Sequence, residues 1–352
     1  MIRRNLLKLT VAAAALSMAA GAAVAQDAAA AAEPVVIGVS IPSATHGFMG
    51  GLNWHAQQTI DRLGETYPNV SFVLATAGDA AKQVSDIEDM LATRDIDGLV
   101  AIGGGSTVGL GKALSLRTGL PHLAVPTTYA GSEMTPILGE TTNGIKTTQH
   151  SQDLVPDAVI YDVDLTVSLP PHVSAASGLN AIAHAVEALY APDANPLTSL
   201  MAEDGTAALA RALPRIVAAP ADAGARRDAL YGAWLCGVCL GAVGMSLHHK
   251  LCHVLGGMFN LPHAETHAIV LPHAAAYNAA AAPEAMTRIA RALRTDDAPQ
   301  GLFDLAQRLA LPRRLADIGM PEDGIARAAE MAVRSPYANP RPVERVAIQD
   351  LI

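Results

Sequence analysis

The sequence predicts an α/β protein with a doubly wound parallel sheet in its N-terminal domain and an all-helical C-terminal domain. Short apolar runs alternate with helical patterns in the first part of the chain, and the connections between them are short. After about residue 168 the chain is rich in Ala and Leu and has few strand-like runs. Its 352 residues exceed the length of about 250 to 300 that one hydrophobic core usually reaches, so two domains are expected.

The predicted sheet starts with a βαβαβ unit. Apolar runs and helical patterns alternate as strands at 35–41, 70–75 and 98–102 and helices at 48–63 and 79–92. Short connections between such elements are typical of parallel strands. A further strand is expected at 123–126, and proline-rich breaks at 192–196 and 336–342 separate the later helices.

Charge and cysteine content narrow the function. The net charge of -9, with no long basic run, would repel a phosphate backbone, so no nucleic-acid partner is expected. The cysteines are Cys236, Cys239 and Cys252, an odd number that argues against a disulfide framework. Cys236 and Cys239 lie in an apolar run without a second pair to complete a zinc site. We interpret them as small residues in a buried helix.

The N-terminal residues have the pattern of a secretory signal. The pattern consists of Arg3, Arg4 and Lys8, an apolar stretch at 9–20 and a small-residue motif at 23–25. It predicts cleavage before Gln26, and residues 3–8 also resemble a twin-arginine export signal. The apolar stretch is shorter than the roughly 20 residues that span a bilayer, so no membrane association is expected after cleavage.

The chain up to about residue 99 resembles the opening of a periplasmic sugar-binding receptor of the ribose-binding type. The resemblance rests on the export signal, the strand at 36–41, the loop at 42–48 and the closing phrase at 95–99. It implies that His46 and Phe48 contact sugar. Such receptors need a second lobe, and nothing downstream resembles one, so we expect no competent sugar site.

Two loops that follow predicted strands have the composition of a nucleotide site. The first is a glycine-rich turn made of Gly103, Gly104, Gly105 and Ser106. It opens a helix, so its backbone N–H groups can approach a phosphate at the positive helix end, although such turns also occur without a ligand. Thr127 and Thr128 follow the next strand and supply hydroxyls at the same edge, where open α/β sheets bind nucleotides.

Histidines recur at helical spacing in the second half of the chain. The set consists of Asn180 and His184, His249 and His253, and His263. The first pair lies in a helix predicted at 177–191, and both pairs are spaced four apart, so each pair shares one helix face. His263 follows Gly256 and Gly257, which we interpret as a turn. Histidines so spaced are typical of divalent metal sites, whereas a single histidine is more often a hydrogen-bonded core residue.

Together these motifs resemble the iron-type alcohol dehydrogenases. Further matching sequence motifs are Gly131-Ser132-Glu133, Gly178-Leu179-Asn180-Ala181, His249-Lys250-Leu251-Cys252-His253 and Leu271-Pro272-His273. The sequence of residues 101–352, especially 183–190 and 248–250, is similar to the maleylacetate reductase branch of that family. The resemblance implies that the glycine-rich turn and the paired threonines hold the pyrophosphate of NADH or NADPH.

The resemblance also implies a metal site, with one departure from the family pattern. The family's ligands are one Asp and three His, and the matching positions here are Asn180, His184, His249 and His263. At Asn180 a neutral amide replaces an anionic oxygen donor, which lowers the affinity for a divalent cation. Maleylacetate reductases commonly show this change and are regarded as working without metal. We therefore expect no tightly bound metal.

The chemistry implied by the resemblance is reduction of the carbon–carbon double bond of maleylacetate to 3-oxoadipate. Hydride addition to an enone places negative charge on the ketone oxygen, so the site must stabilise an enolate and protonate a carbon. His253 is the expected principal catalytic group, because imidazole titrates near neutral pH and can donate a proton. The other catalytic candidates are His184, His249 and His263. Lys250 is the nearest cationic candidate for the dicarboxylate substrate, and a solvated lysine is the alternative.

The expected organisation is a signal at 1–25, a hybrid dinucleotide-binding-like domain at 33–165 with a join near 99–101, and a helical catalytic domain at 166–352. Packing across such a join was not selected as a unit, so we expect a loosened domain. A reductase, a periplasmic sugar-binding module and an inactive fusion of the two families all stay open. The signal predicts the periplasm, whereas reductase chemistry predicts the cytoplasm. A homodimer is the candidate assembly.

Overall fold

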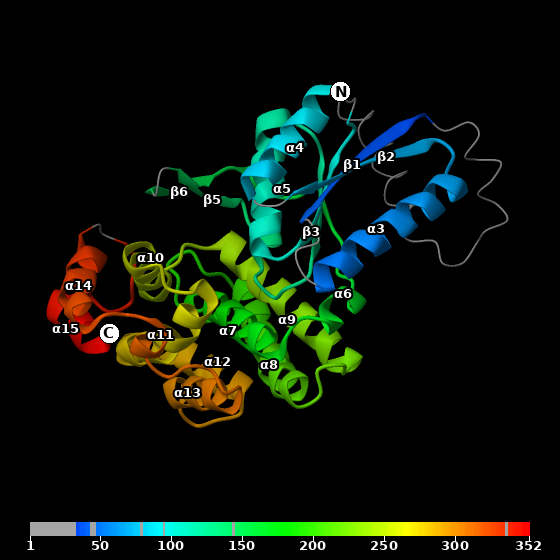
Figure 1. The fold of residues 1–352 in the computed structure, drawn as a ribbon. Coiled ribbons are helices and arrows are strands. Elements are labelled where there is room, and N and C mark those ends of the chain that lie inside the picture. Colours follow the sequence, from blue (N-terminus) through cyan, green and yellow to red (C-terminus); the bar gives the residue numbers. More distant parts are fainter. Residues whose placement is uncertain (1–32, 43–46, 78–79, 94–95, 143–144, 335–336) are drawn as a thin grey trace. The chain divides into compact units, whose positions relative to one another are not determined.

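The computed structural model describes residues 33–42, 47–77, 80–93, 96–142, 145–334 and 337–352 (Figure 1). The chain forms two compact units, Met1–Leu99 and Val100–Ile352. The export signal predicted at 1–25 and the sugar-contact candidate His46 lie outside the described residues.

The first unit consists of two parallel strands and two helices. Strand β1 (Val35–Pro42) pairs in parallel with β2 (Val70–Ala77), with Val35 opposite Val70. Helices α3 (Gly47–Thr66) and α4 (Ala80–Thr93) follow the two strands, and both helices contact the pair. The alternation predicted from the apolar runs is confirmed, including the bounds of each element to within a few residues.

The second unit begins with a three-stranded sheet of order β3-β4-β7. Strand β3 (Leu99–Gly103) leads into α5 (Gly105–Thr118), which returns the chain to β4 (His122–Pro126). All five residues of β4 are buried, and β4 pairs in parallel with the short β7 (Ala158–Val159). An antiparallel hairpin of β5 (Ile137–Thr142) and β6 (Ile145–His150) was not predicted.

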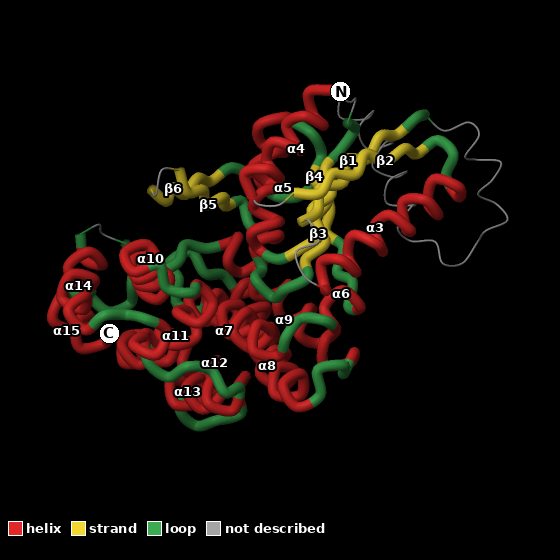
Figure 2. Tube along the Cα trace, in the orientation of Figure 1, coloured by secondary structure: helices red, strands yellow, loops and turns green. Residues whose placement is uncertain are grey.

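Helices make up the rest of this unit, as predicted (Figure 2). The α-helices are α6 (Asp164–Val167), α7 (Pro171–Ala188), α8 (Pro196–Ala218), α9 (Ala223–Ala242), α10 (Leu247–Phe259), α11 (His263–Asn278), α12 (Pro283–Leu293), α13 (Ala298–Arg308), α14 (Ile325–Val333) and α15 (Arg345–Leu351). Short 3-10 turns are η1 (Ser132–Met134), η2 (Gln152–Leu154), η3 (Ala279–Ala281), η4 (Leu315–Ile318) and η5 (Glu322–Gly324).

Helix α7 is the central element of the helical region. Every residue from 174 to 188 is buried, and α7 contacts α8, α9 and α11. Helix α11 belongs to two hydrophobic cores, because Leu271 faces the core around α7 while Ile269 faces the core around α10 and α14. The side chains of α7, α10 and α11 are therefore brought together between the two cores.

Two local predictions were wrong. The helix expected at 177–191 instead spans Pro171–Ala188, because a proline at its first position starts it earlier. Gly256 and Gly257 form no turn but lie inside α10, which ends at Asn260 in the left-handed conformation with φ 53°. Glycine costs only about 1 kcal/mol in a helix, and packing of the apolar face offsets that cost.

The prediction for Cys236 and Cys239 is confirmed, because both are free thiols buried within α9. Among the described residues, no single helix has both the length and the apolar character to cross a membrane. Helices α9 and α10 meet that test only as a pair, across a bend of 93°.

Candidate active site

The glycine-rich turn and the paired threonines come together where β3 and β4 end. The N–H of Thr127 donates to the carbonyl of Gly103 at 2.9 Å, which ties the two loops side by side. A methyl group on Gly104 would lie 3.0 Å from Cγ2 of Thr128, so a larger residue would crowd the paired threonines and glycine leaves the turn open. Gly104 caps α5 without a side-chain hydrogen bond, so the helix offers uncapped N–H groups to an anion such as a pyrophosphate.

The loop after β4 continues from this cradle to the histidines. Gly131 has φ 77°, a conformation that favours glycine. A Cβ atom on it would lie 2.9 Å from Cα of Gly237 in α9 and 3.6 Å from Nδ1 of His184 in α7. The backbone of this loop therefore lies directly against helix α9 and beside the first histidine of the site.

A buried lysine that the sequence reasoning missed holds the same loop. The ammonium of Lys112, on α5, donates to the carbonyls of Ser132 (2.5 Å), Thr135 (2.7 Å) and Ile137 (3.0 Å) and to the Thr135 hydroxyl (2.9 Å). Burial lowers the pKa of Lys112 to about 8, and the nearby Glu133 carboxylate opposes that shift. A lysine between Gly111 and Ala113, in the otherwise apolar stretch 108–114 of the helix, was the available signal.

Six histidine side chains form a cluster between α7, α10 and α11. The members are His184, His248, His249, His253, His263 and His267, and neighbouring ring centroids lie 4.3 to 6.5 Å apart. The structure thus brings together all four predicted catalytic candidates. His248 and His267 were not predicted as site residues. The spacing of four between His263 and His267 was a signal for the second of them.

The cluster has a buried side and an open side. His184 and His249 are buried, whereas His253 and His263 are exposed. Burial, reinforced by neighbouring histidines, holds the pKa of both His184 and His249 well below the ordinary value, so these two imidazoles are neutral. A substrate would therefore reach the cluster from the side of His253 and His263.

Five buried polar atoms of the cluster and of Asn180, one helical turn before His184, have no hydrogen-bond partner among the described residues. They are Oδ1 of Asn180, Nδ1 of His184, Nε2 of His249 and both ring nitrogens of His267. Buried polar atoms in native proteins are nearly always paired, so unpaired ones indicate a place that a ligand completes. Asn180, His184 and His249 are three of the four positions that match the family's metal ligands.

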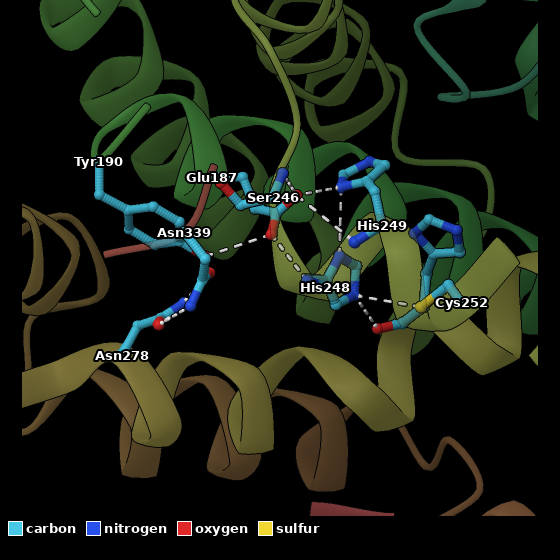
Figure 3. Close-up of polar contacts among 9 residues, drawn as sticks. Glu187, Tyr190, Ser246, His248, His249, Cys252, Asn278 and Asn339 are labelled. Atoms are coloured by element: carbon cyan, nitrogen blue, oxygen red, sulfur yellow. Dashed lines mark hydrogen bonds and ion pairs between the residues drawn. The ribbon is translucent and has the colours of Figure 1, made fainter. Parts of the chain in front are cut away.

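A buried carboxylate, also missed as a site residue, supports the cluster from behind (Figure 3). Glu187, three residues after His184 on α7, has no exposed surface. It accepts hydrogen bonds from the N–H of Ser246 (2.9 Å) and the N–H of His248 (2.7 Å), and Nδ1 of His249 lies 2.7 Å from one of its oxygens. Burial raises the pKa of Glu187, and these N–H groups with the nearby His248 oppose the shift.

Lys250 does not point into this group. Its ammonium lies 5.9 Å from the centroid of the Tyr337 ring, in the segment that precedes α15. Because it neighbours His249 in sequence on a helix, the two side chains leave α10 in different directions. The structure therefore gives no support to Lys250 as the group that faces a dicarboxylate.

Metal-donor atoms assemble in two places among the described residues, and neither is the family position. Donor atoms lie within 4.8 Å of one another in the sets His248–Cys252–His267 and Glu187–His248–His249. Neither set contains His184 or His263. With a neutral amide at Asn180 as the only oxygen donor of the matching positions, these residues do not fit the family's metal site.

Comparison with known proteins places this geometry in a family. The model of iron-containing alcohol dehydrogenases matches residues 53–163, and that of the C-terminal part of the Fe-containing alcohol dehydrogenase family matches residues 174–352. The first match runs across the join expected near 99–101 and includes much of the stretch that resembles a sugar receptor.

Individual relatives agree with the family match. Maleylacetate reductase of Burkholderia cepacia is 62% identical over 256 residues, and that of Sphingobium indicum is 61% identical over 258; each match covers 73% of both chains. The crystal structure of maleylacetate reductase from Agrobacterium tumefaciens is similar with a TM-score of 0.81 at 46% identity, covering 94% of this chain and 91% of that one. The chain belongs to the iron-containing alcohol dehydrogenase family.

Proposed function

We propose that the protein reduces maleylacetate to 3-oxoadipate with NADH or NADPH. The observation that carries this proposal is the histidine cluster, with its unpaired buried acceptors, beside an uncapped glycine-rich turn. The maleylacetate reductases that are 61% and 62% identical to this chain support the choice of substrate.

Cofactor binding and proton donation are assigned to residues at two ends of the site. The N–H groups of residues 103–106 and the hydroxyls of Thr127 and Thr128 would hold the cofactor pyrophosphate. When bound, the cofactor would supply a hydride to the double bond, which would place an electron pair on the ketone oxygen as an enolate. An imidazole N–H stabilises that oxygen even when neutral, and a carbon of the enolate then takes up a proton. His253, on the open side, is the group placed to donate it.

Activity of a histidine variant tests this proposal. NADH absorbance is followed with maleylacetate for the wild type and for His253→Ala. We expect maleylacetate-dependent oxidation by the wild type and a kcat/KM lower by about 10² to 10⁴ in the variant, the usual contribution of a general acid. His273→Ala removes an exposed histidine of α11 outside the cluster and serves as the matched control. A wild type that oxidises neither NADH nor NADPH with maleylacetate would refute the function.

We further propose that the site works without a tightly bound divalent metal. Asn180 supplies no charge, and the donor atoms of His184, His249 and His263 do not gather as one set. Asn180→Asp restores the anionic donor and should raise Co²⁺ affinity at least about tenfold, read from the visible spectrum of the bound ion. His184→Asn in the same background is the control. Equal and tight Co²⁺ binding by wild type and Asn180→Asp would contradict the proposal.

The sugar-binding alternative and the export signal need separate tests. The family match starts at residue 53, so we assign the first unit to the reductase and expect no heat when ribose is titrated into the protein. Export stays a prediction, for which cell fractionation and N-terminal sequencing are the check. Cleavage before Gln26 is the expected result.

A further inference from the structure

We propose that Glu187 is a positioning residue that fixes the tautomer of His249, so that Nε2 of His249 presents a lone pair to the site. This inference concerns the same site as the proposed reduction and rests on that function for its kinetic consequence. The tautomer itself follows from the contacts of Glu187 and His248 and can be measured without any activity.

The contacts of Glu187 show that its carboxylate only accepts hydrogen bonds. One oxygen accepts from the N–H of His248, and the other accepts from the N–H of Ser246 and faces Nδ1 of His249 at 2.7 Å. Helix α10 begins directly after Ser246, whose side chain caps nothing, so Glu187 takes the place of the missing cap. Backbone N–H donors to both oxygens favour the ionised carboxylate, which has no hydrogen to donate. The atom of His249 that faces this carboxylate then carries the hydrogen.

His248 leads to the same tautomer by an independent path. Its Nε2 lies 2.9 Å from the carbonyl oxygen of His267, which can only accept, so His248 carries its hydrogen on Nε2. Nδ1 of His248 is then a bare acceptor, and it lies 3.4 Å from Nδ1 of His249. His248 therefore offers no hydrogen to Nδ1 of His249. Both neighbours present acceptor atoms to Nδ1, which favours the Nδ1–H form.

The consequence appears on the opposite edge of the ring. With its hydrogen on Nδ1, His249 offers an acceptor lone pair at Nε2, the atom that is buried and unpaired. Oδ1 of Asn180, also unpaired, is a second acceptor of the cluster. His249 then accepts a hydrogen bond from an ordered water, since the dicarboxylate maleylacetate has no donor group of its own. Donation to the enolate falls to the histidines on the open side, His253 and His263.

Nitrogen NMR of the histidine rings tests the tautomer directly. Protein labelled with ¹⁵N-histidine is recorded near neutral pH, and the His249 signals are identified by their loss in His249→Asn. We expect a protonated Nδ1 and an unprotonated Nε2 for His249. A wild-type spectrum with hydrogen on Nε2 overturns the proposal, whatever any variant does.

A conservative variant tests the kinetic consequence. Glu187→Gln removes the charge and replaces one acceptor oxygen by an NH₂ group, so His249 should lose its single tautomer. We expect kcat with maleylacetate to fall about 10- to 100-fold, with the KM for NADH within about twofold, as for other groups that orient a functional histidine.

Tyr190→Phe is the matched control, because the Tyr190 hydroxyl lies 3.5 Å from Oε1 of Glu187, whereas His249 faces Oε2. In this variant the His249 tautomer and kcat should stay as in the wild type. Unchanged kcat and an unchanged His249 signal in Glu187→Gln would refute the positioning role. A wild type with the Nδ1–H tautomer but no reduction of maleylacetate would refute the proposed function and leave the tautomer standing.

Discussion

The loop after β4 and the start of α10 are both held by a single buried charge, but the charges have opposite sign. Lys112 is 1% exposed and donates to four oxygen atoms of the loop, while Glu187 is fully buried and accepts from N–H groups at the start of a helix. An irregular loop leaves carbonyls unpaired, whereas the first turn of a helix leaves N–H groups unpaired. The sign of each buried charge follows from which backbone groups its segment leaves free.

Replacing the buried cation tests this comparison with the largest expected effect. Lys112→Met leaves the carbonyls of Ser132, Thr135 and Ile137 without their donor in a buried place. We expect a loss of about 3 to 5 kcal/mol in the free energy of unfolding, measured with urea, together with weaker NADH binding. Lys250→Met, at a partly exposed lysine, should change the same quantity by less than about 1 kcal/mol. A small effect of Lys112→Met would show that water satisfies the loop.

A glycine substitution separates loop shape from loop charge. Gly131→Ala places a Cβ atom in a left-handed residue and 2.9 Å from the α9 backbone at Gly237. We expect a loss of about 2 to 3 kcal/mol in unfolding free energy. Gly257→Ala is the control, because that glycine lies in α10 with open space around it and should gain about 0.5 to 1 kcal/mol. Equal effects in the two variants would contradict the close approach of loop and helix.

The smallest expected effect on stability is the acid sensitivity of β4, the strand that leads into the loop. His122 starts β4 and is buried, and burial lowers its pKa to about 4, assisted by the charge of Lys112. The folded protein thus binds this proton less readily than the unfolded chain. The stabilisation is complete above the ordinary pKa near 6.5 and is lost as the pH falls toward 4.

At pH 5 the low pKa of His122 should reduce the free energy of unfolding of the wild type by about 2 kcal/mol relative to pH 7.5. His122→Leu should remove that share of the pH dependence, which urea unfolding at the two pH values measures. Other buried histidines contribute to both proteins equally and cancel in the comparison. The same loss in both proteins would show that His122 has no part in it.

The elements were predictable because their signals are local. The apolar runs that became β1, β2 and β3 needed only the period of their own residues, and the turn at 103–106 needed only its glycines. The hairpin of β5 and β6 escaped because its strands are mostly polar and carry little apolar alternation. Gly256 and Gly257 misled the prediction, since their intrinsic preference for turns is weaker than the packing of α10.

The sequence by itself determined most of the strands and helices, the cradle for an anion and the spacing that puts Asn180 with His184 on one helix face and His249 with His253 on another. Only the tertiary structure decided which partners hold these groups. Glu187 meets Ser246 and His249 across 59 and 62 positions, and Lys112 meets Ile137 across 25. Such contacts depend on how whole helices and loops pack, and no local periodicity encodes them.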